Sequence, residues 1–110
     1  METIGFIGLG KMGTSIATNI QKAGYPMVVC DLREELTQPF VATGARRASS
    51  PAETARLGDI IFSALPAPED IEDAAIGPEG ILHGIKNNGV YVDISTSSPA
   101  LIRKIEPLFR

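Results

Sequence analysis

Three glycines near the amino terminus constrain the fold of this chain more than any other feature. They lie at Gly8, Gly10 and Gly13, immediately after residues 3–7, an apolar run whose β-branched and aromatic side chains predict a buried strand. A helical pattern begins directly after them. In the order strand, G-x-G-x-x-G, helix, the first glycine permits a tight turn, the second lets the backbone approach a pyrophosphate, and the third lets the helix pack closely on the strand. The positive end of the helix then faces the phosphates, so the pattern predicts a dinucleotide-binding turn.

Apolar runs and helical patterns alternate along the rest of the chain. Further strands are predicted at residues 27–31, 46–48, 59–65 and 90–94, and helices after Gly13, at 34–42 and 50–57, after Pro68 and after Pro99. Pro39 should make the helix at 34–42 short or broken. This alternation predicts one α/β domain over residues 1–110, with a Rossmann-like parallel sheet of about five strands and helices on both faces. Ligands of such sheets bind at the carboxyl ends of the strands.

Local patterns give further expectations. Four apolar side chains share one face of the first helix, which should pack on the sheet: Met12, Ile16, Ile20 and Ala23. Ser50 and Glu53 predict a capping box at the start of the helix at 50–57. Cys30 lies in an apolar run and is expected to be a small core residue. His83 has no base, nucleophile or metal ligand around it in the sequence, so it is expected at the surface.

Composition restricts the class of function. The chain has 110 residues, 44% of them hydrophobic and 21% charged, with a net charge of −3, which is typical of one globular domain. Because there is no basic excess, a nucleic-acid partner is not expected. No apolar run approaches the ~20 residues of a membrane span, so no membrane partner is expected either. A single cysteine and the lack of a basic signal-peptide region favour a reducing, cytoplasmic location.

Asp31 stands at the end of the second predicted strand, eighteen residues after Gly13. A dinucleotide-binding turn is expected to have an acid at about this distance, where it hydrogen-bonds the hydroxyls of the adenosine ribose. The alternative is an aspartate that merely ends a strand. A carboxylate repels a 2′-phosphate and therefore favours NAD over NADP. Arg33, however, follows the strand where NADP-binding proteins place an arginine, so NADP stays open.

Two other segments end strands on the same predicted edge. Leu65 and Pro66 close the fourth strand, either as a simple stop or as an apolar wall beside a cofactor, and the spacing does not choose between these. The segment 93–99, Asp-Ile-Ser-Thr-Ser-Ser-Pro, places several hydroxyls after the fifth strand, where a nicotinamide or a small polar substrate could reach them. A helix cap at Ser98 and Pro99 explains the last serine but not the earlier ones.

These segments together resemble a known family. Residues 5–13 (Gly-Phe-Ile-Gly-Leu-Gly-Lys-Met-Gly), Leu65-Pro66 and the segment 93–99 are similar to the β-hydroxyacid dehydrogenases, which include 3-hydroxyisobutyrate dehydrogenase and tartronate semialdehyde reductase. That family is related to 6-phosphogluconate dehydrogenase through its cofactor domain. The D-x-S-T-x-S-P element is the most specific part of the resemblance. The 6-phosphogluconate enzymes themselves would have a glycine–asparagine pair where this chain has Ile94-Ser95.

The resemblance implies a role for each matching position. Gly8, Leu9, Gly10, Lys11, Met12 and Gly13 would hold the pyrophosphate, and Asp31, Leu32 and Arg33 would contact the adenosine ribose. Leu65 and Pro66 would line the cofactor, and Thr96 would approach the nicotinamide ribose. Ser95 and Ser97 neighbour the substrate position of the family. The implied cofactor is NAD or NADP, with NAD favoured.

The family also has parts that we do not find up to Arg110. Its proton-transfer lysine lies beyond the D-x-S-T-x-S-P element, and a helical second domain closes its active site and builds its dimer. Lys104 matches no family motif and is expected to be a solvated side chain. We therefore expect the cofactor-binding portion of an NAD(P)-dependent oxidoreductase of small β-hydroxy acids or semialdehydes, which alone turns over slowly or not at all.

An alternative hypothesis is a stand-alone dinucleotide-binding module or a non-catalytic subunit. In either case, if the strand at 90–94 ends the sheet, its bare edge predicts weak self-association, and hence a possible homodimer.

Overall fold

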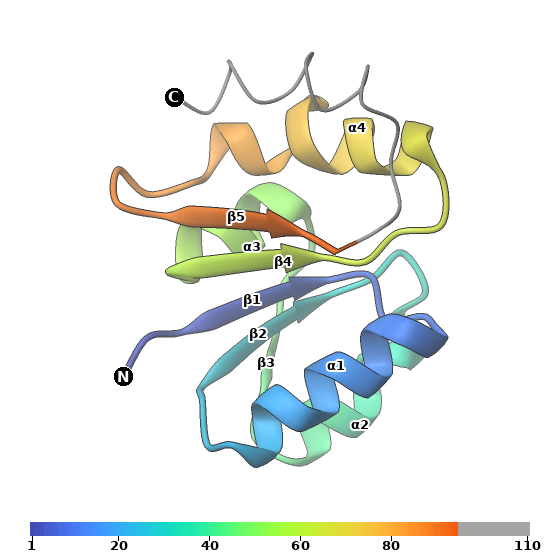
Figure 1. Ribbon diagram of the computed structural model, residues 1–110, viewed down its shortest axis with the longest axis vertical. Helices are drawn as coiled ribbons and strands as arrows, with labels where there is room; N and C mark the ends of the chain where they lie inside the picture. Colours follow the sequence, from blue (N-terminus) through green and yellow to red (C-terminus); the bar gives the residue numbers. More distant parts are fainter. Residues whose placement is uncertain (95–110) are drawn as a thin grey trace.

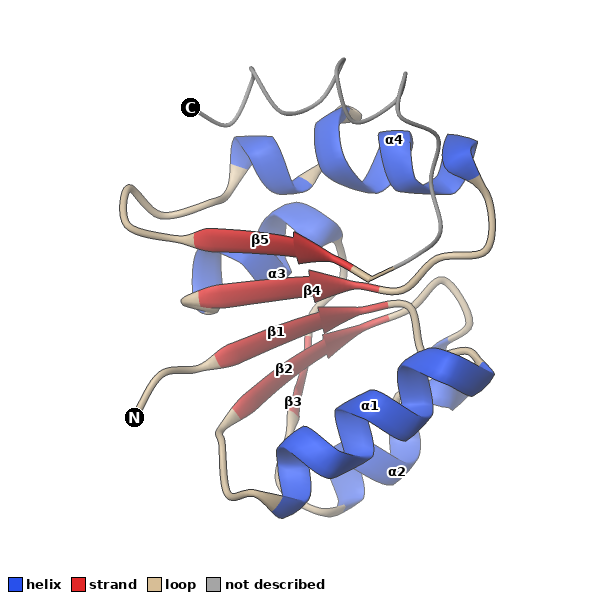
Figure 2. Cartoon of the chain, viewed as in Figure 1, coloured by secondary structure: helices blue, strands red, loops and turns tan. Residues whose placement is uncertain are grey.

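Five strands form one parallel sheet in the computed structural model of this protein, which describes residues 1–94 (Figures 1 and 2). In chain order the strands are β1 (Ile4–Ile7), β2 (Met27–Cys30), β3 (Arg46–Arg47), β4 (Ile60–Ser63) and β5 (Val90–Asp93). They lie in the order β3-β2-β1-β4-β5, and each neighbouring pair is parallel. The predicted Rossmann-like α/β fold is thus confirmed in the described part of the chain.

Helices cover both faces of the sheet, as predicted (Figure 2). They are α1 (Lys11–Lys22), α2 (Gln38–Ala42), α3 (Pro51–Leu57) and α4 (Pro68–Ile76), with short 3₁₀ turns η1 (Glu34–Leu36) and η2 (Ile81–His83). Successive side chains of β1 point to opposite faces. Phe6 packs in one cluster with Ala17 of α1 and Phe40 of α2, whereas Ile7 packs in another with Ala55 of α3. Both faces of β1 are therefore buried.

The order of the strands places a reversal point at the centre of the sheet. The chain proceeds outward from β1 to β2 and β3, then returns to the other side of β1 to form β4 and β5. Ile7 lies opposite both Cys30 and Ser63, and Ser63 lies opposite Asp93, so four strands end at one level. In sheets of this kind ligands bind beside the carboxyl ends of the strands on either side of the reversal.

The buried face of α1 differs from the predicted one. Met12 is 51% exposed and Ala23 is also exposed, whereas the fully buried positions are Gly13 and Ala17. Ile16 and Ile20 flank this face and pack on the core as predicted. The predicted face was partly wrong because it was chosen from the large apolar side chains. The closest approach of α1 to the turn after β1 is made by Gly13, which has no side chain.

Strand and helix ends also needed correction. β4 spans Ile60–Ser63 rather than 59–65; Ala64 N still donates to Ile7 O of β1, but Asp59, Ala64 and Leu65 lie outside the strand. The segment 34–42 is broken, as expected from Pro39, into η1 and the short α2.

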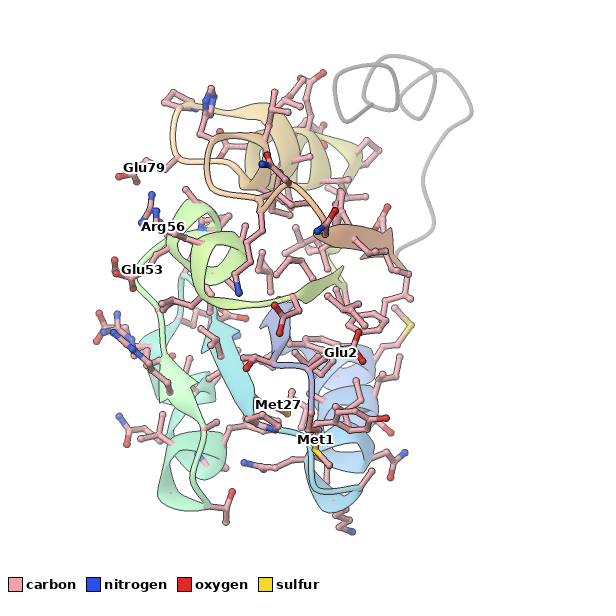
Figure 3. The ribbon with its side chains drawn as sticks, turned by 90° about the vertical axis from the view of Figure 1, so that its left-hand side faces the viewer. Met1, Glu2, Met27, Glu53, Arg56 and Glu79 are labelled. Atoms are coloured by element: carbon pink, nitrogen blue, oxygen red, sulfur yellow. The ribbon has the colours of Figure 1, made fainter. Side chains whose placement is uncertain are left out.

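The capping box predicted at α3 is only half formed. Ser50 Oγ accepts a hydrogen bond from Glu53 N at 3.1 Å, but the Glu53 carboxylate accepts from Ser49 N at 2.8 Å instead of from Ser50. Ser50 is therefore the N-cap as predicted, and only the reciprocal bond of the Glu53 carboxylate lies one residue further out, at Ser49. Glu53 and Arg56 lie along the outer surface of α3 (Figure 3).

The remaining local expectations agree with the structure. Cys30 is a free, buried core residue, and burial is the main cause that raises the pKa of its thiol. His83 is exposed. Within residues 1–94, β5 pairs only with β4, and Val90 at its start is 51% exposed. No helix in that range has the length and apolar character needed to cross a membrane.

Candidate functional site

The turn between β1 and α1 requires two of its three glycines for reasons internal to the protein. Gly8 has φ +93°, a region that residues with side chains rarely adopt, and a Cβ on it would collide with the carbonyl oxygen of Ala64. A Cβ on Gly13 would collide with the carbonyl oxygen of Gly8. The turn is fixed further because Thr14 Oγ1 donates to Leu9 O at 2.7 Å. Strand and helix can approach this closely only with glycine at both positions.

Gly10 is different, because no contact within residues 1–94 requires it to be glycine. Its φ of −69° is accessible to any residue, and a Cβ built on it has no neighbour within 4 Å among those residues. The residue is exposed and forms the N-cap of α1. A glycine is needed at such a position when a ligand approaches the backbone, since a side chain would occupy the ligand's space.

The amino end of α1 is open to a negatively charged group. It has no side-chain cap and no acidic residue in its first turn, whereas α3 has both a serine cap and Glu53. Lys11 and Met12, the first two residues of the helix, are exposed. A helix start of this type presents backbone N–H groups and a partial positive charge, which together suit a phosphate.

Asp31 connects this turn to the segment that follows β2. Its Oδ2 accepts a hydrogen bond from Leu9 N at 2.7 Å, and its Oδ1 accepts one from Arg33 N at 2.8 Å. The acid that was predicted to contact a ribose therefore also braces the glycine turn. A carboxylate has about four acceptor positions, so these two bonds leave capacity for sugar hydroxyls.

The segment after Asp31 is exposed and rich in charge. Leu32 is fully exposed, and the Arg33 side chain is 71% exposed. Arg33 Nε lies 3.3 Å from Glu35 Oε1, and Arg47 of β3 pairs with Glu34. The sequence singled out Arg33 but missed Arg47, because the adjacency of β3 to β2 brings Arg47 to this place.

The predicted wall at Leu65 lies beside the glycine turn. A Cβ on Gly8 would be 2.9 Å from Leu65 Cδ2, so the leucine side chain borders the turn directly. Leu65 also packs against the clusters beneath α3 and α4, while Pro66 is exposed. The structure thus places Leu65 next to the turn and not merely at the end of a strand.

A polar cluster that the sequence did not indicate lies between the ends of β4 and β5. The hydroxyls of Ser63 and Tyr91 are 2.7 Å apart, and Ser63 Oγ donates to Asp93 Oδ1 at 3.1 Å. Burial is the main cause that raises the pKa of Tyr91 to about 12. The pairing of Ser63 with Asp93 in the sheet brings these side chains together. Thr96, Ser95 and Ser97, which follow this cluster in the sequence, lie outside the described residues.

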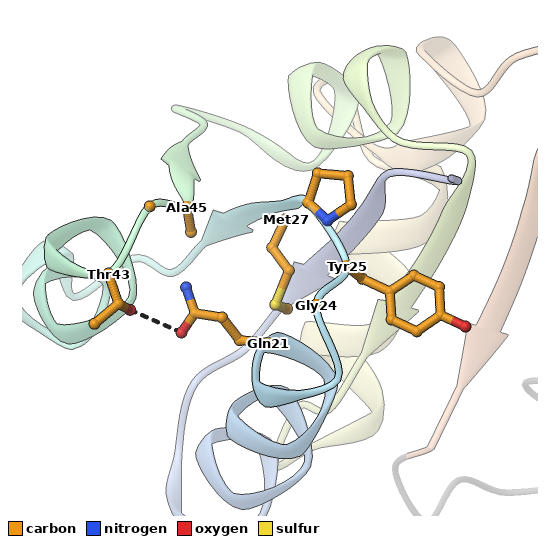
Figure 4. Close-up of a pocket in the computed structure, with 8 residues that line it drawn as sticks. Gln21, Gly24, Tyr25, Met27, Thr43 and Ala45 are labelled. Atoms are coloured by element: carbon orange, nitrogen blue, oxygen red, sulfur yellow. Dashed lines mark hydrogen bonds between the residues drawn. The ribbon is translucent and has the colours of Figure 1, made fainter.

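A surface hollow of about 300 Å³ lies elsewhere, near the amino ends of β2 and β3 (Figure 4). Its lining includes Gln21, whose side chain donates to Phe40 O at 3.1 Å and accepts from Thr43 Oγ1 at 2.9 Å. The side-chain amide of Gln21 is therefore already hydrogen-bonded within the protein. Within residues 1–94 there is also no group of three or more His, Cys, Asp or Glu side chains placed to hold a metal ion. The carboxyl edge of the sheet is therefore the candidate site.

Comparison with known families shows what the chain is similar to. Residues 3–109 match the model of the NAD-binding domain of 6-phosphogluconate dehydrogenase. Mitochondrial 3-hydroxyisobutyrate dehydrogenase of Mus musculus is 36% identical over 102 residues, which are 93% of this chain and 30% of that protein. Cytokine-like nuclear factor N-PAC of Danio rerio is 37% identical over 104 residues, 94% of this chain and 22% of that protein. The chain thus spans less than a third of the length of either relative.

Solved structures show the same arrangement. The Mycobacterium tuberculosis 3-hydroxyisobutyrate dehydrogenase with L-serine superimposes with a TM-score of 0.86 at 26% identity, covering 99% of this chain and 36% of that one. Psf3 in complex with NADP⁺ and 2-OPP superimposes with a TM-score of 0.89, also at 26% identity, covering 96% of this chain and 38% of that one.

Proposed function

The chain belongs to the family of the NAD-binding domain of 6-phosphogluconate dehydrogenase, and from this premise we propose that its glycine turn and Asp31 bind NAD in preference to NADP. The pyrophosphate lies on the segment 8–13, against the backbone of Gly10 and the open amino end of α1. Asp31 accepts hydrogen bonds from the adenosine ribose hydroxyls, beside Leu32 and Arg33. A 2′-phosphate would meet this carboxylate, which is the reason for the preference.

The nicotinamide half of the cofactor lies toward the ends of β4 and β5 in this proposal. Leu65 and Pro66 form its apolar wall, as supported by the contact distance between Leu65 and the position of Gly8. Thr96 approaches the nicotinamide ribose, and Ser95 and Ser97 neighbour the substrate. These three begin two residues after Asp93, whose carboxylate accepts a hydrogen bond from Ser63 on the same edge.

The single observation that carries the proposal is that no atom of the described residues lies near the position of a Cβ on Gly10. Gly10→Ala tests it, because the backbone geometry admits alanine and the added Cβ has no neighbour within 4 Å in the described part of the chain. The loss of a good N-cap costs a few tenths to about 1 kcal/mol, and the smaller entropy of the unfolded chain returns about 0.4–1 kcal/mol. The variant should therefore keep the midpoint of thermal unfolding of the wild type.

Isothermal titration with NADH and NADPH is the matching measurement. We expect the wild-type chain to bind NADH more tightly than NADPH, and Gly10→Ala to bind NADH at least about tenfold more weakly because its methyl group meets the pyrophosphate. Equal NADH affinity in the folded variant and the wild type would show that no ligand approaches this backbone. Gly8→Ala is the contrasting variant, since it should lose stability as well as binding.

In the complete protein we propose that this domain serves an oxidoreductase acting on small β-hydroxy acids or semialdehydes. The bound cofactor supplies hydride transfer at the nicotinamide ring. The residues of this chain bind and orient the cofactor, and the proton of the substrate hydroxyl is moved by a group outside the described residues. Support comes from the relative named 3-hydroxyisobutyrate dehydrogenase.

A second candidate function is a dinucleotide-binding domain without catalysis. The relatives named cytokine-like nuclear factor N-PAC favour it, because that name describes no enzyme. The two candidates differ in a turnover assay of the complete protein with NAD and 3-hydroxyisobutyrate. Binding of NADH without any turnover of β-hydroxy acids supports the second candidate, and turnover supports the first.

A further inference from the structure

We propose that Glu34 and Glu35 determine the coenzyme preference of this site, by holding Arg47 and Arg33 in ion pairs that a 2′-phosphate would have to break. The inference rests on the proposed function and adds to it a pair of specificity-determining residues. It concerns the short 3₁₀ turn η1, from which both glutamates extend.

The first ion pair lies beside the proposed ribose position. Asp31 Oδ1 accepts from the backbone N–H of Arg33, which anchors that residue next to the carboxylate. The Arg33 side chain donates from Nε to Glu35 Oε1 at 3.3 Å, and both side chains are about 70% exposed. The pKa of Glu35 is lowered, first by a hydrogen bond with its own backbone and then by Arg33. The arginine that could hold a 2′-phosphate is thus already paired with a carboxylate.

The second ion pair comes from the neighbouring strand. Arg47 of β3 lies opposite Val29 of β2, and its Nη2 donates to Glu34 Oε1. The Arg47 side chain is 37% exposed, so it is less open than Arg33. Glu34 and Glu35 are adjacent in η1, and together they engage both arginines on this side of the sheet.

The charge around the ribose position follows from these pairs. The two ion pairs each cancel in charge, so the carboxylate of Asp31 leaves one negative charge among these five side chains. A 2′-phosphate brings about two further negative charges and is repelled. The ribose hydroxyls of NAD carry no charge and can donate hydrogen bonds to the Asp31 carboxylate. The glutamates therefore disfavour NADP in two ways, through charge and through competition for the guanidinium groups.

Exposed ion pairs of this type are weak, so removing a glutamate should give a moderate gain in NADPH affinity. We expect Glu35→Gln to raise NADPH affinity about threefold and the double variant E34Q/E35Q about tenfold, with NADH affinity unchanged within about a factor of two. Glu79→Gln is the matched control, because it removes the same charge from an exposed position near the start of η2 (Figure 3). The control should change neither affinity.

The experiment is isothermal titration of the full chain with NADH and NADPH, in the wild type, the three variants and an Arg33→Gln background. If the ion pair contributes, Glu35→Gln raises NADPH affinity more in the wild type than when Arg33 is already glutamine, because only the loss of repulsion remains in that background. An equal gain in both backgrounds, or an unchanged NADPH/NADH ratio in a chain that binds NADH, overturns the inference and leaves the proposed function standing. Failure of the wild type to bind either nucleotide overturns both.

Discussion

Removing the Asp31 carboxylate should weaken the folded protein even when no nucleotide is present. Leu9 is only 1% exposed, and its backbone N–H donates to Asp31 Oδ2 at 2.7 Å. Asp31→Ala leaves this buried amide without its acceptor, which costs about 2 kcal/mol. The second bond, from Arg33 N, is exposed and adds little, because water replaces it.

Asp31→Asn separates the contribution of the hydrogen bond to stability from the effect of the negative charge on coenzyme preference. Its amide oxygen can still accept from Leu9 N, so we expect a loss of about 0.5–1 kcal/mol, smaller than that of the alanine variant. The NH₂ group then faces the Arg33 amide, where two donors meet. Because the amide also lacks the negative charge, the asparagine variant should discriminate less against NADPH, although its fold is nearly as stable as the wild type.

Urea unfolding followed by far-UV circular dichroism measures these differences, since the chain contains no tryptophan. With a slope of about 1.5 kcal/mol per molar urea, Asp31→Ala should lower the midpoint by about 1.3 M. Glu79→Ala, which removes an exposed acid away from the turn, should leave the midpoint in place. An unchanged midpoint for Asp31→Ala would refute the view that this carboxylate braces the glycine turn.

Two further outcomes are expected. Burial raises the pKa of Tyr91 to about 12, from about 10 for an ordinary tyrosine, so the folded protein keeps this proton to a higher pH than the unfolded chain. Stability should therefore fall as the pH rises from about 10 to 12, and Tyr91→Phe should flatten that part of the curve in urea titrations at several pH values. The edge of β5 should give weak, concentration-dependent dimerisation that Val90→Lys suppresses, and light scattering that shows a monomer at every concentration of the wild type would contradict this expectation.

The turn at Gly8–Gly13 could be predicted from sequence because its requirements are local. A strand, a tight turn and a helix lie within a few residues, and Gly13 is needed for its contact with Gly8, five residues earlier. The close approach of Gly8 to Ala64, just after β4, adds a requirement that is not local. Pro39 and Ser50 likewise act within their own segments, and the breaks and caps that they predict are present.

Features that depend on the pairing of distant segments could not be predicted. The contacts of Ser63 with Tyr91 and Asp93 require the register between β4 and β5, which no local pattern specifies. The pairing of Arg47 with Glu34 requires β3 to lie beside β2. The exposed Met12 was missed for a different reason, because the helix face was inferred from the apolar side chains although Gly13 already marked the side that packs closely.

The common level at which four strands end has a consequence for how such a domain can change. Ile7, Cys30, Ser63 and Asp93 are aligned across the sheet, so the residue that follows each of them begins at the same boundary. The sheet ends there, and in the proposed binding mode the segments after β2 and β4 meet different parts of the cofactor. We therefore expect a substitution after β2 to change the affinity for one end of the cofactor, and a substitution after β4 the affinity for the other, without disturbing the hydrogen bonds of the sheet. The hydrogen-bonded strands must stay as they are, whereas the segments that follow them can vary in sequence.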